Sequence, residues 1–584
     1  MNQLRPSRRA LSIAVSLVLV LSMALPAAAV PAPEGVDLQV VSRIRLEATQ
    51  HSKVMQTLAE LSDRIGPRLS GSQHLKDANL FTQKQLADWG LVNSHLEGFS
   101  FGRGWALDSV SIRMTAPDTA IIFGIPKAWT PATNGVLKGE VVALRVKSVE
   151  ELEKLKGQFA GKIVLVGEPR ELTLETKAAS RRYDEAGLKE VAEYQIPGGS
   201  YRDPTGRVWT REEIMQRRRL SMATDRFLQD EKVAATIEAS RWDYGLILVQ
   251  GTQNYKPGSP DGVPQVVIAA EQFNRIARLL DKKIPVTVEL DVKSHFESPD
   301  NGQIYNTIAE IPGTDKKDEV VMIGGHLDSW HSGTGATDNG AGVTVAMEAV
   351  RILQALGVKP RRTIRIGLWG GEEEGLLGSE AYVKEHFGYV DVPKGDNTPS
   401  YMRATPLPIV VKPGQEKVSA YFNLDNGSGK IRGIYAQENS AVVPLFEEWG
   451  KPFQDLGFTT VTLRNTGSTD HVSFDAVGIP GFQFIQDWLE YDTRTHHSNM
   501  DVYDHAQRED LIQASIIMAS FLYNAAMRDE MLPRKPLLVE VKHEPAPAAA
   551  APEAKPGKHG KPSKAAASPE TKTEANAPAA TAKP

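Results

Sequence analysis

From about Asn301 onward, continuous apolar runs alternate with longer helical patterns. The runs EVVMIGGHLD and TIRIGLWG each enter a loop, and AGVTVAMEAVRILQALG and LLGSEAYVKEHFG follow them with helical spacing. The candidate inner face of the first helix consists of Val343, Met347, Val350 and Leu353. Apolar strands that alternate with helices are typical of a mostly parallel sheet covered by helices on both faces. We therefore predict an α/β fold of this type, completed by SAYFNLDNGSG, GIPGFQF and the helix EDLIQASIIMASFLYNAAMR.

A second folded unit is expected because 584 residues exceed the length of one ordinary domain. Residues 35–115 contain two helical patterns, VMQTLAELSDRIG and LKDANLFTQKQLADWG, separated by the loop GPRLSGS. Residues 130–295 differ, because the short β-rich runs GEVVALRV, GKIVLVGEP, YGLILVQG, VPQVVIAA and IPVTVELDV recur between Gly and Pro. This region has no cluster of His and carboxylates. We expect an inserted β-rich domain that supplies shape and access rather than chemistry.

The two ends of the chain differ in composition from the rest. Residues 1–30 contain a basic opening, the apolar stretch LSIAVSLVLVLSMAL and small residues, which is typical of a signal peptide cleaved near Ala29. The alternative is an uncleaved membrane anchor, although the apolar run is short for a span. Residues 544–584 are rich in Ala, Pro and Lys, and we expect them to be disordered. The protein is thus predicted to be exported to the periplasm or outside the cell, by a Sec or a Tat route.

The charge and cysteine content limit the partners. The net charge is −5, and no basic stripe with interleaved aromatic residues suggests nucleic acid. No segment after the leader is apolar enough to cross a bilayer, so no stable membrane association is expected after cleavage. The chain has no cysteine, so stability depends on the core and on metal rather than on disulfides. The oligomeric state is not encoded in any pattern that we can read.

Candidate functional residues lie at the ends of the predicted strands. They are His326 and Asp328 in GGHLDSW, Asp338 in GATDNGAG, Glu372, Glu373 and Glu374 in WGGEEEGLLGS, Asp425 in FNLDNG, and His497 in THHSNMD. In open α/β sheets, ligands bind beyond the carboxyl ends of the strands. Imidazoles and carboxylates without thiolates suit zinc, with manganese and cobalt as rivals. A cluster so rich in carboxylates can hold two metals that share one bridging carboxylate.

Each of these short patterns is common by itself. HLD is usually a surface turn, DNG is a frequent turn sequence, and three consecutive glutamates usually form a solvated acidic face. Their joint occurrence at successive strand ends favours a metal site over independent coincidences.

The motifs GGHLDSW, GATDNGAGV, WGGEEEGLLGS, NLDNG, STDHVSF and HHSNMD together resemble the co-catalytic zinc exopeptidases of the aminopeptidase and glutamate carboxypeptidase type. The overall arrangement is most similar to their carboxypeptidase Q-like branch. GPRLSGS also matches this family. By this resemblance, residues 35–115 and 301–543 form the peptidase domain, and the β-rich insert resembles a protease-associated domain.

The resemblance also implies a role for each residue. His326 and Asp425 hold one zinc ion, Glu373 and His497 hold the other, and Asp338 bridges the two zinc ions. Asp328 orients the imidazole of His326. Glu372 is the general base, because in the family a Glu-Glu pair stands one residue before Gly-Leu. Glu374 is then a bystander.

Two assignments stay open at this stage. His496 precedes His497, although the Ser-Asn-Met-Asp that follows favours His497 as the ligand. STDHVSF contains Ser468, Asp470 and His471, but the chain lacks the G-x-S-x-G turn of a serine hydrolase. We expect His471 near the substrate, where it hydrogen-bonds the tetrahedral intermediate.

These residues predict an exported zinc aminopeptidase or dipeptidase that cleaves the terminal bond of a peptide or dipeptide. A carboxypeptidase would use the same centre with a cation for the terminal carboxylate. A glutaminyl cyclase-like enzyme would use a single zinc, which the complete ligand set disfavours. A receptor-like binding protein could keep the fold without metals, but such proteins usually lose ligands. Side-chain preference is not readable from the sequence.

Overall fold

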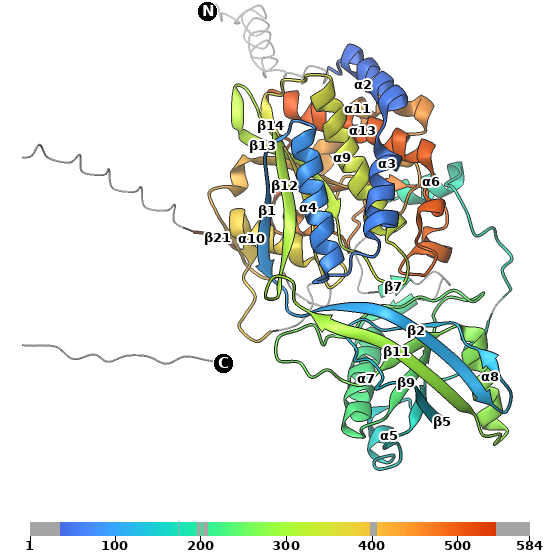
Figure 1. The fold of residues 1–584 in the computed structure, drawn as a ribbon. Coiled ribbons are helices and arrows are strands. Elements are labelled where there is room, and N and C mark those ends of the chain that lie inside the picture. Colours follow the sequence, from blue (N-terminus) through green and yellow to red (C-terminus); the bar gives the residue numbers. More distant parts are fainter. Residues whose placement is uncertain (1–34, 173, 196–199, 203–207, 397–405, 545–584) are drawn as a thin grey trace, which may run out of the picture. The chain divides into compact units, whose positions relative to one another are not determined.

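The computed structural model describes most of the chain (Figure 1). The described residues are 35–172, 174–195, 200–202, 208–396 and 406–544. The predicted signal peptide and, apart from Glu544, the predicted tail lie outside these residues. Every helix of the described part is too short or too polar to cross a membrane.

An eight-stranded sheet forms the centre of the peptidase part, in the order β1-β12-β14-β13-β17-β20-β18-β19. Its strands are β1 (Val92–Ser100), β12 (Gln303–Ile311), β13 (Lys316–His326), β14 (Arg362–Trp369), β17 (Val418–Asn423), β18 (Ile431–Tyr435), β19 (Thr460–Thr462) and β20 (Gly481–Gln486). The four neighbours β14, β13, β17 and β20 are parallel. β1 pairs antiparallel with β12, β12 with β14 and β18 with β20, whereas the edge strand β19 is parallel to β18. The predicted mostly parallel α/β sheet is therefore confirmed, with antiparallel strands toward its edges.

Helices cover both faces of this sheet, as predicted. Successive residues of a strand point to opposite faces. Val321 and Ile323 pack in a core with the helices α4 (Gln73–Asp88), α9 (Ala341–Ala355) and α13 (Arg508–Met527). Val320 and Met322 pack in a separate core with α10 (Leu377–His386) and α12 (His471–Asp475). The apolar stretch of β13 from Val320 to Ile323 is thus buried from both sides of the sheet.

Helix α9 is more deeply buried than its sequence suggests. The predicted inner face is buried, but so is every other residue from Ala341 to Leu353. The physical reason is a further layer of helices, because α9 packs on β13 and also against α13, α2 (Leu38–His51) and α3 (Val54–Ala59). Its two charged residues in this stretch, Glu348 and Arg351, pair with each other at 2.8 Å.

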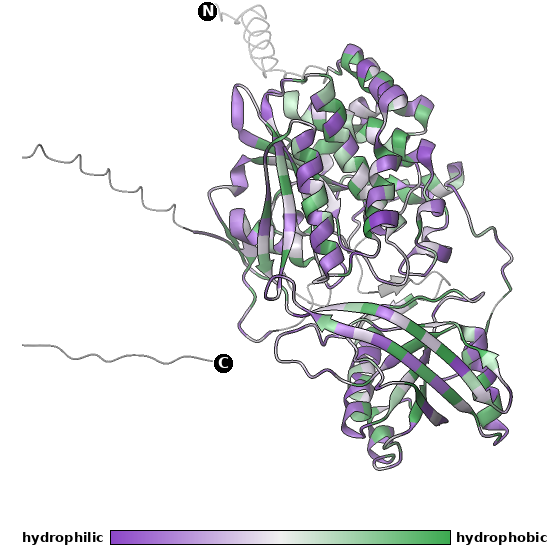
Figure 2. Cartoon of the chain, viewed as in Figure 1, coloured by the Kyte–Doolittle hydropathy of each residue, from purple (hydrophilic) through white to green (hydrophobic). Residues whose placement is uncertain are grey.

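The second sheet also has eight strands, in the order β3-β2-β11-β5-β6-β9-β10-β4. They are β2 (Gly104–Ala116), β3 (Ala120–Ile121), β4 (Gly124–Pro126), β5 (Leu137–Leu144), β6 (Ile163–Val166), β9 (Ala235–Ala239), β10 (Gln265–Ile268) and β11 (Thr287–Glu297). Figure 1 shows β2 and β11 as a long antiparallel pair. In Figure 2, hydrophobic and hydrophilic residues alternate along β11, in line with its alternating burial. We call the part of the chain from β2 to β11 the insert.

The insert has its own apolar core. On one face of the sheet, Ile163 and Leu165 pack with α8 (Ala270–Asp281). On the other, Val164 packs with α5 (Val149–Glu153) and α7 (Arg211–Asp230). Because β2 begins at Gly104, the second sheet takes in residues on both sides of the expected boundary near residue 115.

The run YGLILVQG, residues 244–251, differs from its prediction as a strand of the insert. It contributes only two isolated bridges, one between Gly251 and Ala128 and one between Leu248 and Ser498. The second bridge joins the insert to the peptidase part. The apolar side chains of Ile247 and Val249 pack with Val267 and Ala269 of the insert, whereas the backbone of this run pairs with Ser498 of the peptidase part.

Candidate metal centre

The predicted site residues meet where three parallel strands end. β13 ends at His326, Glu372 follows the end of β14, and Asp425 follows the end of β17. β13 lies between β14 and β17 in the sheet, so their carboxyl ends share one edge. Asp338 reaches this edge from the turn Ala336–Gly340 that precedes α9.

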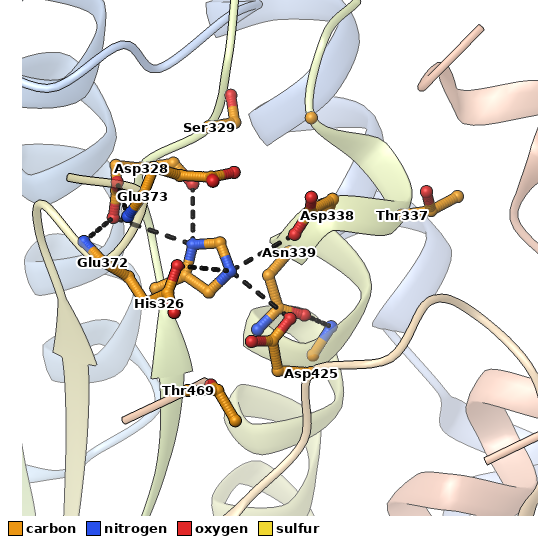
Figure 3. A network of polar contacts seen from close by, with 12 residues as sticks. His326, Asp328, Ser329, Thr337, Asp338, Asn339, Glu372, Glu373, Asp425 and Thr469 are labelled. Carbon is orange, nitrogen blue, oxygen red and sulfur yellow. Dashed lines mark hydrogen bonds and ion pairs between the residues drawn. The ribbon is translucent and has the colours of Figure 1, made fainter. Parts of the chain in front are cut away.

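His326 lies at the centre of a first group of ligand atoms (Figure 3). Its Nε2 atom is 3.3 Å from Asp338 Oδ1 and 3.4 Å from Asp425 Oδ1. The imidazole is fully buried, and both carboxylates are more than 90% buried. These three residues form one candidate metal-binding group.

His497 completes a second group on the other side of Asp338. Its Nε2 atom is 3.2 Å from Asp338 Oδ2 and 3.0 Å from Glu373 Oε2. Asp338 therefore has one carboxylate oxygen facing each imidazole. His496 Nε2 lies farther away, 3.8 Å from Asp338 Oδ2, and its side chain is 39% exposed against 16% for His497. The geometry favours His497 of the two histidines.

The donor set fits zinc. Two ligand atoms bound to one tetrahedral zinc at ~2.0–2.1 Å lie ~3.4 Å apart, close to the four nitrogen–oxygen separations of 3.0 to 3.4 Å. Four atoms in these two groups are buried and make no hydrogen bond within the described structure: His326 Nε2, Asp338 Oδ2, Glu373 Oε1 and Asp425 Oδ1. Buried polar atoms without partners are rare and call for an explanation such as a bound ion.

The electrostatics of the site also call for positive charge. Burial favours the neutral imidazole, but the carboxylates of Glu373 and Asp338 raise the pKa of His497 to about 10. The pKa of Asp338 lies well below its usual range, because contacts with His326 and His497 outweigh the effect of burial. Protons on the imidazoles thus balance the carboxylates, and zinc binding to neutral imidazoles would release such protons.

Glu372 occupies a different position from Glu373. Its Oε2 atom is 3.9 Å from His326 Nε2, farther than the two candidate ligands of that ring. Burial raises the pKa of Glu372 well above its usual range; His326 opposes the shift, and Asp425 adds to it. Glu374 points elsewhere, with both carboxylate oxygens buried next to Ser70 and Asp328. The three consecutive glutamates therefore have three different environments.

Asp328 holds the loop that carries these glutamates. Its carboxylate accepts hydrogen bonds from the backbone N–H groups of Glu372 at 3.1 Å and Glu373 at 3.2 Å, and from Ser70 Oγ at 3.2 Å. The same carboxylate is 3.7 Å from His326 Nδ1, whereas the backbone carbonyl of Asp328 is 3.1 Å from that atom. The imidazole of His326 is therefore within hydrogen-bond distance of the backbone carbonyl of Asp328 rather than of its carboxylate.

Asp501, a residue without a predicted role, holds Asp338 in a similar way. Its carboxylate accepts hydrogen bonds from Thr337 N at 2.6 Å, Thr337 Oγ1 at 2.7 Å and Asp338 N at 3.2 Å. Asp501 is the last residue of the motif HHSNMD, so its position four residues after His497 could have identified it as part of the site.

Arg68, in the motif GPRLSGS, organises the loop between His326 and Asp338. The guanidinium is fully buried and donates to the carbonyls of Leu327 at 2.6 Å, Thr334 at 2.9 Å and Gly335 at 2.7 Å. Gly335 has a φ of +65°, and a Cβ there would lie 2.7 Å from Arg68 Nη2. Composition alone assigned GPRLSGS to a loop, and it gave no sign of this contact.

Two further residues lie in contacts that were not predicted. Trp330 had no predicted role, and His471 was expected to contact the substrate. Trp330 Nε1 donates to Glu373 Oε2 at 2.7 Å. His471 is fully buried, and its Nε2 atom lies 2.9 Å from Gln437 Nε2 and 3.1 Å from Thr466 O. These contacts engage one ring nitrogen of His471 with protein, so the predicted contact with substrate depends on Nδ1.

Comparison with known proteins identifies a family for the peptidase part. Residues 306–522 match peptidase family M28. Carboxypeptidase Q from Mus musculus is 26% identical over 484 residues, which cover 82% of this chain and 87% of that protein. These matches leave open whether the insert is a protease-associated domain, which stays a prediction.

Two solved structures share the fold. A peptidase M28 precursor from Shewanella amazonensis SB2B has a TM-score of 0.61 at 24% identity, covering 85% of this chain and 99% of that chain. A zinc aminopeptidase from Bacillus subtilis has a TM-score of 0.51 at 20% identity, covering 82% and 97%. The predicted family resemblance is confirmed: residues 306–522 match peptidase family M28, and the protein is a zinc metallopeptidase.

Proposed function

We propose that this protein is an exported exopeptidase with two zinc ions, which removes a terminal residue from peptides or dipeptides with a free α-amine. The observation that carries the proposal is the position of Asp338 between two imidazoles, each of which also faces a second carboxylate. The leader-like residues 1–30 support export to the periplasm or outside the cell.

In this proposal, His326 and Asp425 would hold one zinc ion, Glu373 and His497 would hold the other, and Asp338 would offer one carboxylate oxygen to each. The separations of 3.0 to 3.4 Å within each group support this division. Two zinc ions bound in this way would polarise the scissile carbonyl and lower the pKa of a water molecule toward neutrality.

Glu372 is proposed as the general base. Its carboxylate borders the first group without being as close to His326 as the two ligands are. From this position it accepts a proton from the attacking water and then delivers it to the leaving nitrogen. The backbone hydrogen bonds from Glu372 and Glu373 to Asp328 hold the base and the neighbouring ligand in a fixed relation.

A carboxypeptidase is the second candidate, and the similarity to carboxypeptidase Q favours it. This activity needs a cation for the terminal carboxylate of the substrate. Arg68 is a cation close to the site carboxylates, but it is fully buried and its donors are bound to backbone carbonyls. We therefore favour recognition of a free amine.

The test combines metal removal with substrates blocked at either end. Dialysis against a chelator should abolish cleavage of dipeptides, and zinc should restore it. The zinc-loaded enzyme should cleave amino acid amides with a free amine and ignore peptides acetylated at that amine. Activity that survives complete metal removal contradicts the zinc mechanism. A requirement for a free carboxylate, with acetylated peptides cleaved, would replace the aminopeptidase by the carboxypeptidase.

A further inference from the structure

We propose that Gln250 of the insert is a positioning residue for the zinc ligand His497, so that the insert completes the metal centre. The inference rests on the proposed function, since it assumes that His497 binds zinc. It assigns to the insert a part in the chemistry that its own sequence, without a cluster of His and carboxylates, does not indicate.

The imidazole of His497 lies between the two parts of the chain. Its Nε2 atom faces Glu373 at 3.0 Å and Asp338 at 3.2 Å. Its Nδ1 atom lies 3.2 Å from the side-chain amide of Gln250. The ring thus directs one nitrogen to the candidate zinc site and the other to the insert.

The insert also holds the backbone of this ligand. His497 has a φ of +57°, a left-handed conformation that costs energy for a residue other than glycine. The carbonyl of His497 accepts hydrogen bonds from Val249 N at 3.3 Å and from Ser332 Oγ at 3.2 Å. One residue on, Ser498 forms the isolated bridge with Leu248.

The next residue adds two more bonds between the same segments. Asn499 N donates to the carbonyl of Ile247 at 3.1 Å, and Asn499 Oδ1 accepts from Ile247 N at 2.7 Å. Residues 247–250 and 497–499 therefore form a short paired segment. This pairing explains why the apolar run YGLILVQG lies outside the sheet of the insert.

An amide suits the position next to Nδ1 because it can both donate and accept. When His497 binds zinc through Nε2, Nδ1 carries the proton and needs an acceptor, which the Oε1 atom of Gln250 provides after a half-turn of the amide. Without zinc, the Nε2–H tautomer leaves Nδ1 as an acceptor for the amide N–H of Gln250. Partners of this kind fix the orientation of a ligating histidine, and their loss typically costs ~10–100-fold in metal affinity.

The test measures zinc affinity rather than activity. Gln250→Met keeps the length of the side chain but removes the hydrogen bond, whereas Gln250→Glu keeps an acceptor. The matched control is Gln272→Met, also in the insert, where the amide bonds Phe123 N at 2.7 Å and Ile121 O at 2.8 Å away from the centre. Zinc per chain is measured during titration against a competing chelator, together with the melting temperature.

Gln250→Met should bind one of its two zinc ions ~10–100-fold more weakly, with the other ion and the melting temperature of the zinc-free protein unchanged. Gln250→Glu and Gln272→Met should bind both ions about as tightly as wild type. Equal zinc affinity in Gln250→Met and wild type overturns the inference alone. Equal losses in Gln250→Met and Gln272→Met also overturn it, since the effect then comes from the insert as a whole. Wild type that binds fewer than two zinc ions overturns the proposed function as well.

Discussion

The two eight-stranded sheets of this protein share a plan but differ at one edge. Each has four parallel strands at its centre, β14-β13-β17-β20 in the peptidase part and β5-β6-β9-β10 in the insert. Each has helices packed on both faces. Within the described residues, the clusters of His and carboxylate atoms close enough to hold a metal are His326–Asp338–Asp425 and Asp338–His496–His497, and both belong to the peptidase part.

The difference lies in how charge is treated at the strand ends. In the insert, Arg145 follows β5 and pairs with Asp281 at 2.9 Å and with Glu168 at 3.5 Å, where the Glu168 side chain is 57% exposed. In the peptidase part, carboxylates at the strand ends are buried, and several of their oxygens lack hydrogen bonds. The comparison teaches that two sheets of one plan differ in the chemistry of their strand ends: a cation paired with carboxylates in the insert, and buried carboxylates gathered around imidazoles in the peptidase part.

The largest effect is expected for Glu372→Gln. The amide keeps the size of the side chain but cannot accept the proton of the attacking water, so kcat should fall ~10²–10⁴-fold. Zinc content should stay at two ions per chain, since Glu372 is not a proposed ligand. The matched control is Glu168→Gln at the end of β6 in the insert, which should leave kcat unchanged. Loss of zinc from Glu372→Gln would show that this residue is a ligand instead.

Glu373→Ala should lower the zinc content from two ions toward one. The second group would keep only His497 and one oxygen of Asp338, while His326 and Asp425 still serve the first. Metal analysis after dialysis at a fixed free zinc concentration measures the stoichiometry. Two tightly bound ions in this variant would remove Glu373 from the ligand set.

One buried histidine of the peptidase part, His471, should make stability depend on pH. Burial lowers the pKa of His471 to about 4, against about 6.5 in an unfolded chain. The unfolded chain therefore binds more protons between these values, and stability falls as the pH is lowered. From pH 7.5 to pH 5, the free energy of unfolding should lose about 2 kcal/mol through this residue.

Urea unfolding of the zinc-free protein at both pH values tests this expectation. His471→Gln should depend on pH by about 2 kcal/mol less than wild type. His295→Gln is the matched control in the insert, because the side chain of His295 is 54% exposed. Equal pH dependence in wild type and His471→Gln would mean that His471 does not stay neutral in the folded protein.

Glu374→Gln should have the smallest effect. Its carboxylate lies next to Ser70 and Asp328 rather than between the imidazoles, so kcat should stay within about threefold of wild type, a change of under ~0.7 kcal/mol. The zinc content should stay at two ions per chain. A steady-state assay with metal analysis compares it with the other two glutamates. If Glu374 proves indispensable while Glu372 is tolerant, the proposed base is shifted by two positions.

Much of the fold, and most residues of the candidate metal site, could be predicted from hydrophobic periodicity and from the positions of these residues at strand ends. The runs before His326, Glu372 and Asp425 are mostly apolar, with Arg365 and Asn423 among the exceptions, which predicts neighbouring parallel strands whose ends meet. Only the residues that follow the pair indicated that His497, rather than His496, is the candidate metal ligand. The order of the ligands along the chain thus carried more information than any one motif.

The remaining contacts depend on tertiary packing, which sequence periodicity does not encode. Gln250 and Arg68 are separated from their partners by 247 and 259 residues. The complete burial of α9 depends on α2 and α3, which pack on the side away from the sheet. The run YGLILVQG has the composition of a strand, but its partner is a loop of the peptidase part.

The long sequence separation between Arg68 and Leu327 has a consequence for the order in which this chain folds. Leu327, whose carbonyl it binds, is made 259 residues later, which takes on the order of 10–50 s at ~5–20 residues per second. Strands β1 and β2 and the whole insert emerge during that interval. The insert can close its core from its own residues, whereas contacts so distant along the chain form slowly. We expect the metal centre to become native last, so that zinc uptake marks the end of folding.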